Sequence, residues 1–185
     1  MSEWIPMLSE ADMAPELAER LRERVERLGY LGEFFRYAAH QPRALMSFLS
    51  FTEDLKRALP DNLTEVVALS VAGLMKNAYE RVQHERLSLK LGFSESWVRD
   101  VLALRPEAEG CLSEQESSVQ RLVLALIRRH GHATQLELKA LVRSIGSEKA
   151  IAVLMLVGRY VTHSLIVNSL ELPPPLPSPL EGNEP

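Results

Sequence analysis

Residues 62–97 read NLTEVVALSVAGLMKNAYERVQHERLSLKLGFSESW, the longest helical apolar pattern of the chain and its tightest cluster of proton-transfer side chains. Apolar residues recur every three or four positions, which is typical of an α-helix. Asn77, three residues before Glu80, resembles a capping box, so we expect one helix to end and another to begin there. Gly92 is expected to end the second helix, and Ser94 to cap a third.

The same three- and four-residue spacing extends over most of the chain. It predicts further helices at about 15–28, 31–39, 43–59, 94–104, 113–130, 134–144 and 147–170. Capping boxes are predicted at Ser113 with Glu116 and at Thr134 with Glu137. The last helix is the most apolar and should lie centrally or in a subunit interface. No strand-like alternation or Gly-rich nucleotide-binding motif stands out, so the expected fold is all-α with mostly antiparallel helices.

Length and composition predict one soluble domain. The chain has 185 residues, 46% of them hydrophobic, and a net charge of −4 without a long Lys or Arg run, which argues against nucleic-acid binding. The single cysteine, Cys111, excludes an internal disulfide and is typical of a reducing compartment. The N-terminus does not resemble a signal peptide, and no uninterrupted apolar segment of 18 residues occurs. We therefore expect a cytoplasmic protein with no membrane association.

The C-terminal end differs in composition from the rest. Six prolines fall within the last fifteen residues, ELPPPLPSPLEGNEP, which excludes a helix or a central strand. We expect a single domain over residues 1–172, with its core at about 43–105, and a proline-rich tail over 173–185. The tail is expected to be either a polyproline-like arm against a neighbour or disordered, and a peptide ligand is a further alternative.

Glu80 and His84 lie four residues apart, so their side chains share one helix face and can share a proton. Glu65 can join them only if the chain turns, and the Asn77 cap supplies such a turn. A purely structural interpretation is also open: Glu80 caps the helix with Asn77, His84 is a buried histidine bonded to a carboxylate, and Glu65 complements a helix dipole. Two ligands from Glu80 and His84, with no third donor in sight, make a metal site unexpected.

Two other features invite a functional interpretation. His130 and His132 form an H-x-H pair, but beside two arginines at a helix end they are more typical of residues that interact with the helix dipole. Cys111 has no partner thiol in the sequence and lies in a polar linker, so we expect an exposed thiol without a catalytic role.

The order of these features resembles the carboxymuconolactone decarboxylase and alkyl hydroperoxidase D superfamily. The match is carried by LPDNLTEVVALSVAGLMKNAYERVQHERLSLKLGFSESWVRDVL, with YAAHQPRALMSFLSF before it and VGRYVTHSLIVNSLELPPP after it, and extends over about residues 30–175. The resemblance implies an AhpD-like all-helical fold and a homo-oligomer, whether dimer, trimer or hexamer. In the peroxidase branch a Glu, a C-x-x-C pair and a His form a proton relay. Those positions correspond here to Glu65, Asn77, Glu80 and His84, so the thiols are absent and thiol chemistry is not expected.

The chain therefore looks like the decarboxylase branch, whose members use no metal or organic cofactor. The resemblance implies an acid–base enzyme of the lyase type acting on a small organic acid or lactone. In this hypothesis His84 moves the proton, and Glu80 or Glu65 sets its tautomer and pKa. Asn77, Arg81 and Arg86 are the candidate substrate-binding residues. The alternatives are an AhpD-like peroxidase and a non-catalytic oligomeric binding protein that keeps the fold.

Overall fold

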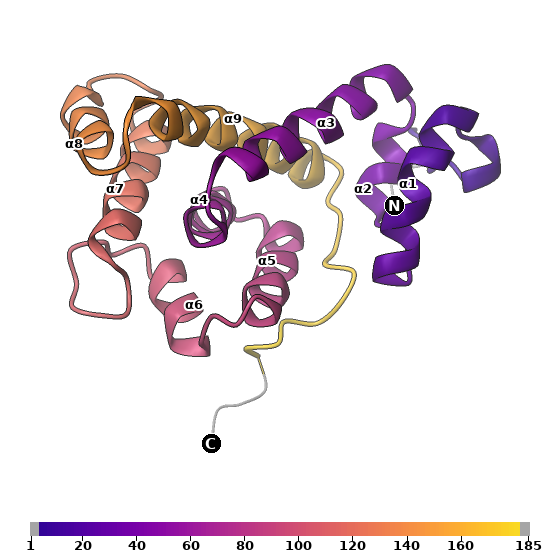
Figure 1. Cartoon of the computed structure of the whole chain (residues 1–185). Helices are drawn as coiled ribbons and strands as arrows, with labels where there is room; N and C mark the ends of the chain where they lie inside the picture. Colours follow the sequence, from indigo (N-terminus) through magenta and orange to yellow (C-terminus); the bar gives the residue numbers. More distant parts are fainter. Residues whose placement is uncertain (1–3, 182–185) are drawn as a thin grey trace.

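The structure is a computed structural model that describes residues 4–181; the side chains of Arg24, Arg27 and Leu28 also lie outside the description. Over the described residues the chain forms α-helices and no strand, as predicted (Figure 1). After a short 3-10 helix at Glu10–Asp12, the helices are α1 (Pro15–Leu28), α2 (Glu33–Ala38), α3 (Pro42–Ala58), α4 (Asp61–Leu74), α5 (Ala78–Lys90), α6 (Glu95–Leu102), α7 (Glu114–Arg128), α8 (Gln135–Ile145) and α9 (Ser147–Ser169).

Helix α4 lies at the centre of the molecule and packs against α5, α6, α7 and α9 (Figure 1). All ten residues from 63 to 72 are buried, so the helix has no solvent-facing side. A helix enclosed on all sides is expected to be apolar all round. The buried polar residues on α4, Glu65 among them, are therefore exceptions that require partners.

The apolar core has two parts. The larger is built from the end of α3 and from α4, α6, α7, α8 and α9, around residues such as Leu69, Val123 and Leu156. The smaller joins α1, α2 and α3 to the end of α9, through Phe34 and Val167 among others. Helix α9 belongs to both parts, and the candidate site lies beside it.

The predicted helix starts at Asn77, Ser94 and Ser113 are confirmed, since each side chain accepts the backbone N–H of the residue three positions later. The capping box predicted at Thr134 is wrong. Thr134 has φ −104° and ψ 9°, away from the extended conformation of an N-cap, and its hydroxyl donates to the carbonyl of Gly131. Glu137 instead pairs with Arg129 at 3.0 Å.

The described part of the tail, 173–181, packs on its own chain, so the disordered alternative is wrong for it, and an arm against a neighbour stays a prediction. Ser178 Oγ donates to Glu85 Oε2 of α5 at 2.5 Å, and Arg99 of α6 donates to the carbonyl of Leu180 at 3.3 Å. Figure 1 shows the segment running from the end of α9 past α5. Residues 182–185 of the predicted tail lie outside the described residues.

Helix α9 is long and apolar enough to span a membrane by length and composition alone, although Arg159 and His163 interrupt its apolar residues, in keeping with the sequence prediction. Half of its most apolar 18-residue stretch is buried inside the protein, and α9 packs against α3, α4 and α8. The core helix of a soluble protein has the same properties. Its outer side nevertheless exposes Ile151, Met155 and Leu165, which lie 53%, 45% and 56% exposed.

Candidate active site

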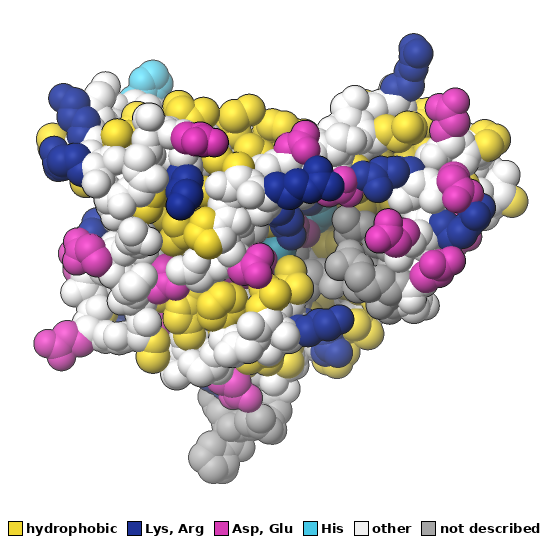
Figure 2. Space-filling model, in the orientation of Figure 1, with side chains coloured by type: hydrophobic (Ala, Val, Ile, Leu, Met, Phe, Trp, Pro, Cys, Tyr) yellow, Lys and Arg dark blue, Asp and Glu magenta, His cyan; other side chains and the backbone are white. Residues whose placement is uncertain are grey.

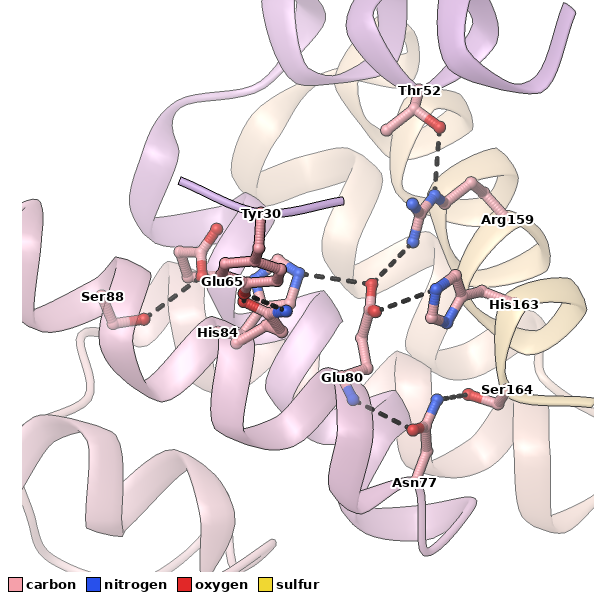
Figure 3. A network of polar contacts seen from close by, with 11 residues as sticks. Tyr30, Thr52, Glu65, Asn77, Glu80, His84, Ser88, Arg159, His163 and Ser164 are labelled. Atoms are coloured by element: carbon pink, nitrogen blue, oxygen red, sulfur yellow. Dashed lines mark hydrogen bonds and ion pairs between the residues drawn. The ribbon is translucent and has the colours of Figure 1, made fainter. Parts of the chain in front are cut away.

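Three helices bring the candidate site together. Helix α4 supplies Glu65, and α5 returns antiparallel to it after a tight turn in which Lys76 has a positive φ of 53° and Asn77 caps the new helix. Helix α5 supplies Glu80 and His84, and α9 supplies further polar groups from the other side (Figure 3). The predicted fold-back at Asn77 thus places Glu65 beside His84, although the two are 19 residues apart in sequence.

The two ring nitrogens of His84 face different carboxylates. Nδ1 lies 2.6 Å from Glu65 Oε2, and because a carboxylate oxygen accepts, Nδ1 carries the hydrogen of this bond. Nε2 lies 3.5 Å from Glu80 Oε1, longer than an ordinary N–H···O bond. Ser88 Oγ also donates to Glu65 Oε2 at 3.2 Å, and the Tyr160 ring meets the imidazole edge to face at 5.2 Å. The ring is therefore held through Nδ1, while Nε2 is the less tightly engaged nitrogen.

Glu80 is the anion at the centre of the cluster. Its carboxylate accepts from Arg159 Nη1 at 2.9 Å and lies 3.2 Å from His163 Nε2, both on α9 (Figure 3). Its backbone N–H donates to Asn77 Oδ1 at 3.0 Å. The purely structural interpretation is therefore right about the Asn77 cap. It is wrong about the Glu80 side chain, which points to α9 instead of to the cap.

The electrostatics favour ion pairs inside the cluster. Burial lowers the pKa of His84, but Glu65 and Glu80 outweigh this effect, so the pKa is raised from its ordinary value. Burial raises the pKa of Glu80, but His163, His84 and Arg159 outweigh it, so this pKa lies well below its usual range. The cluster therefore favours the protonated form of His84 and the ionised form of Glu80.

The raised pKa of His84 predicts a pH-dependent stability. Such a group contributes stability that is fully present below its unfolded-state pKa of about 6.5 and is lost as the pH rises through the folded-state pKa. We expect the free energy of unfolding, measured by urea titration from pH 6 to 9, to fall as the pH rises. In a His84→Asn variant, the free energy of unfolding should fall less steeply with pH. An equal dependence on pH in both proteins would contradict the raised pKa of His84.

The cluster opens on a cavity of about 870 Å³ between the α1–α3 part and the rest of the molecule. Figure 2 shows it as a hollow with histidine atoms inside and Lys and Arg side chains along its edge. Glu80, His84 and the α9 residues Arg159, Tyr160 and His163 line its inner end. The charged residues among the rest of its lining are Arg20, Glu23, Glu53, Lys56, Arg86 and Lys90.

The three predicted substrate-binding residues lie in different places. Arg86 lines the cavity and donates to the carbonyl of Pro177 at 3.3 Å. Arg81 does not line it: it pairs with Glu85 at 3.1 Å and lines a separate pocket of about 720 Å³. Asn77 is buried as the α5 cap, and its amide donates to Ser164 Oγ at 3.0 Å. Neither Arg81 nor Asn77 therefore lines the cavity that His84 lines.

Sequence reasoning missed Arg159 and His163. They lie four residues apart, on one face of a mostly apolar helix, and this spacing is a signal that the sequence does offer. Arg159 also donates to Thr52 Oγ1 at 3.0 Å, and its guanidinium lies over the rings of Phe48 and Tyr160 at 4.8 and 4.3 Å from their centroids.

The other suspected residues lie elsewhere. His130 and His132 are exposed in the turn after α7, and Cys111 is exposed, with its sulfur 3.6 Å from Ser96 Oγ. None of the three lines the His84 cavity. Within residues 4–181, no group of three or more His, Cys, Asp and Glu side chains is arranged to hold a metal ion.

No protein-family model matches the chain, and no curated protein matches its sequence. Solved structures do match. An uncharacterized peroxidase-related protein from Ralstonia eutropha JMP134, an alkylhydroperoxidase AhpD core, superposes with a TM-score of 0.79 at 15% identity, over 91% of this chain and 90% of that one. A putative antioxidant defence protein AhpD from Agrobacterium tumefaciens gives 0.67 at 17% identity, over 76% and 97%.

A third solved structure is a variant of the debrominase Bmp8 in complex with 2,3,4-tribromopyrrole. It superposes with a TM-score of 0.73 at 15% identity, over 94% of this chain and 92% of that one. At sequence identities this low, the superpositions establish a shared fold and do not establish a shared reaction. The extensive superposition on AhpD proteins agrees with the resemblance found in residues 30–175. The chain thus has the all-helical AhpD-like fold.

Proposed function

We propose that the protein is a cofactor-independent acid–base enzyme, of the decarboxylase type, acting on a small organic acid or lactone. The observation that carries the proposal is the difference between the two ring nitrogens of His84. Nδ1 is hydrogen-bonded to Glu65 at 2.6 Å, whereas Nε2 lies 3.5 Å from Glu80, and His84 lines the cavity. A general acid needs a fixed ring and a nitrogen that can reach a substrate atom.

In the proposed reaction, the bond between the carboxylate carbon and its neighbouring carbon breaks and carbon dioxide leaves. The electron pair stays on the neighbouring carbon, where an adjacent carbonyl spreads the charge. His84 Nε2 donates its proton to that carbon and recovers one from solvent. Glu65 keeps the ring in the orientation and protonation state that the transfer requires. The product is the substrate with its carboxylate replaced by hydrogen.

Arg159 takes the place of Arg81 as the proposed partner of the substrate anion. It lines the inner end of the cavity close to His84, and its guanidinium is fixed by Glu80, Thr52 and the two aromatic rings. A guanidinium held in this way is pre-organised to attract a carboxylate. Arg86 lies on the same cavity and remains a proposed contributor at its wall.

The test is a rate measurement on a defined panel. Purified protein is mixed with carboxymuconolactone and with small 3-oxo acids, and both acid consumption and carbon dioxide release are followed. The proposal expects equimolar release on at least one of these acids, at a rate that treatment with a chelator leaves unchanged. No release from any of them would contradict the decarboxylase type.

A peroxide-reducing activity is the second candidate, and it is favoured only by the AhpD proteins that share the fold. The sole thiol, Cys111, is exposed outside the cavity, so the proposed acid–base function predicts no peroxide consumption that depends on it. Hydrogen peroxide with dithiothreitol, supplied to the wild type and to Cys111→Ser, separates the two. Consumption lost in the variant would support the peroxidase instead.

We also propose that the protein is a homo-oligomer that associates through the outer face of α9. Ile151, Met155 and Leu165 form one exposed apolar stripe, and Gly158 within it has open space above its Cα. Exposed apolar stripes of this kind mark protein interfaces. A non-catalytic binding protein of this fold would share the interface, so oligomerisation alone does not separate the two functions.

We expect light scattering to give the wild type a mass that is a multiple of the 20.8 kDa chain. Met155→Glu places a charge in the stripe and should shift the mass toward the monomer. Leu91→Glu is the matched control, because Leu91 is similarly exposed (42%) at the end of α5 and outside the stripe. A monomeric wild type, or an equal shift in both variants, would contradict the interface.

A further inference from the structure

The described tail forms part of the cavity wall. Leu176 and Pro179 line the cavity together with His84 and Arg159. The two residues come from the segment after α9, which crosses α5 on its way to the end of the described chain (Figure 1). The cavity that the helices build is thus closed on one side by a segment without regular secondary structure.

A buried carboxylate fixes this segment to α5. The Glu85 side chain is 0% exposed, and its partners are Arg81 at 3.1 Å and the Ser178 hydroxyl at 2.5 Å. A buried carboxylate is costly unless it is paired and hydrogen-bonded. Ser178 is itself buried and also accepts the backbone N–H of Leu180 at 3.1 Å, so its hydroxyl joins the tail to α5 and shapes the tail at once.

Backbone contacts fix the segment on both sides of Ser178. Arg86 donates to the carbonyl of Pro177, and Arg99 donates to the carbonyl of Leu180, both at 3.3 Å. Proline at 173, 174, 175, 177 and 179 restricts the backbone further, because each ring fixes its own φ and limits the residue before it. Few conformations then remain for Leu176 between these contacts.

We propose that Leu176 and Pro179 determine the size of the substrate, as a wall that the Ser178–Glu85 hydrogen bond holds at a fixed distance from His84. The substrate part of this proposal rests on the proposed function. Leu176 supplies an apolar surface to the same cavity that Arg159 lines, so the favoured ligand carries its carboxylate toward Arg159 and a compact apolar body toward Leu176. Ser178 acts as a positioning residue.

The first test needs no substrate. Diethyl pyrocarbonate modifies accessible histidines, and peptide mass spectrometry gives the rate for each one. Leu176→Ala and Ser178→Ala are expected to raise the modification rate of His84 several-fold relative to that of His130, which is exposed in the same molecule. Leu172→Ala and Ser117→Ala are the matched controls, since both residues are buried and neither lines the cavity.

Thermal unfolding is measured for each variant, and modification is carried out where all are folded. If the His84 to His130 ratio stays the same in Leu176→Ala and Ser178→Ala, or if the controls raise it equally, the wall is contradicted. This result does not depend on whether any acid is turned over.

The second test measures ligand size with benzoate, 1-naphthoate and biphenyl-4-carboxylate as probes in titration calorimetry. The wall predicts that Leu176→Ala improves binding of the two larger acids relative to benzoate by about tenfold, and that Leu176→Trp does the reverse. Equal changes for all three probes would overturn the size role. If no probe binds the wild type while the histidine modification responds as expected, the result supports the tail as the cavity wall and contradicts the proposed acid substrate.

Discussion

Replacing His84 by asparagine is expected to lower turnover of the proposed reaction by about 10²–10⁴-fold, the range that a positioned general acid contributes. Asparagine can still hydrogen-bond to Glu65, but it cannot donate a proton to carbon. The loss should appear in kcat more than in KM, because the cavity and Arg159 remain. Steady-state kinetics on the acid that the wild type decarboxylates would measure it.

The controls for this experiment come from the same chain. His132→Asn changes an exposed histidine outside the cavity and should leave kcat unchanged. Glu65→Gln removes the charge that orients the ring. Its kcat should lie between those of the wild type and His84→Asn, and the pH profile of kcat should change. Full turnover in His84→Asn would exclude His84 as the proton donor.

Glu80→Ala is expected to destabilise the fold by about 3–5 kcal/mol, the usual cost of removing one partner from a buried ion pair. The variant leaves Arg159, whose side chain is only 10% exposed, without the carboxylate 2.9 Å away, and it removes the acceptor beside His163. Both partners on α9 are buried, so solvent cannot replace the lost carboxylate as the counter-charge of Arg159. Urea unfolding should show a lower midpoint with an unchanged m value.

Glu95→Ala is the matched control for the stability measurement. Its carboxylate lies 3.9 Å from Arg99 on the exposed side of α6, and its side chain is 46% exposed. Exposed pairs of this kind contribute about 0–1 kcal/mol. Similar decreases in the free energy of unfolding of Glu80→Ala and Glu95→Ala would mean that the buried cluster at Glu80 contributes no more to stability than an exposed ion pair.

The sequence allowed prediction of those parts of the site that depend on local structure. The Asn77 cap follows from residues close together in the chain. Once this turn is known, α5 runs back along α4, which brings Glu80 and His84 near Glu65. Arg159 was beyond that reasoning, because its contact with Glu80 spans 79 residues and depends on how α9 crosses α5. The helical periodicity that predicted α9 carries no information about its neighbours.

The tail shows a related limit. Its prolines correctly excluded helix and central strand, but composition alone could not reveal that Ser178 meets a buried Glu85, 93 residues earlier in the chain. Thr134 shows the opposite error, since a local capping pattern was present and the backbone conformation did not follow it. Local signals therefore predicted most helix starts, and long-range packing decided which polar side chains meet.

The hairpin of α4 and α5 also bears on how the protein folds. The bond between Glu65 and His84 closes a loop of 19 residues, whereas the contact between Glu80 and Arg159 closes one of 79. The entropy of loop closure differs by about 1 kcal/mol between these lengths, in favour of the shorter loop. Loop closure alone therefore favours forming the hairpin with its histidine–carboxylate pair over forming the contact with α9. The complete charge cluster needs both.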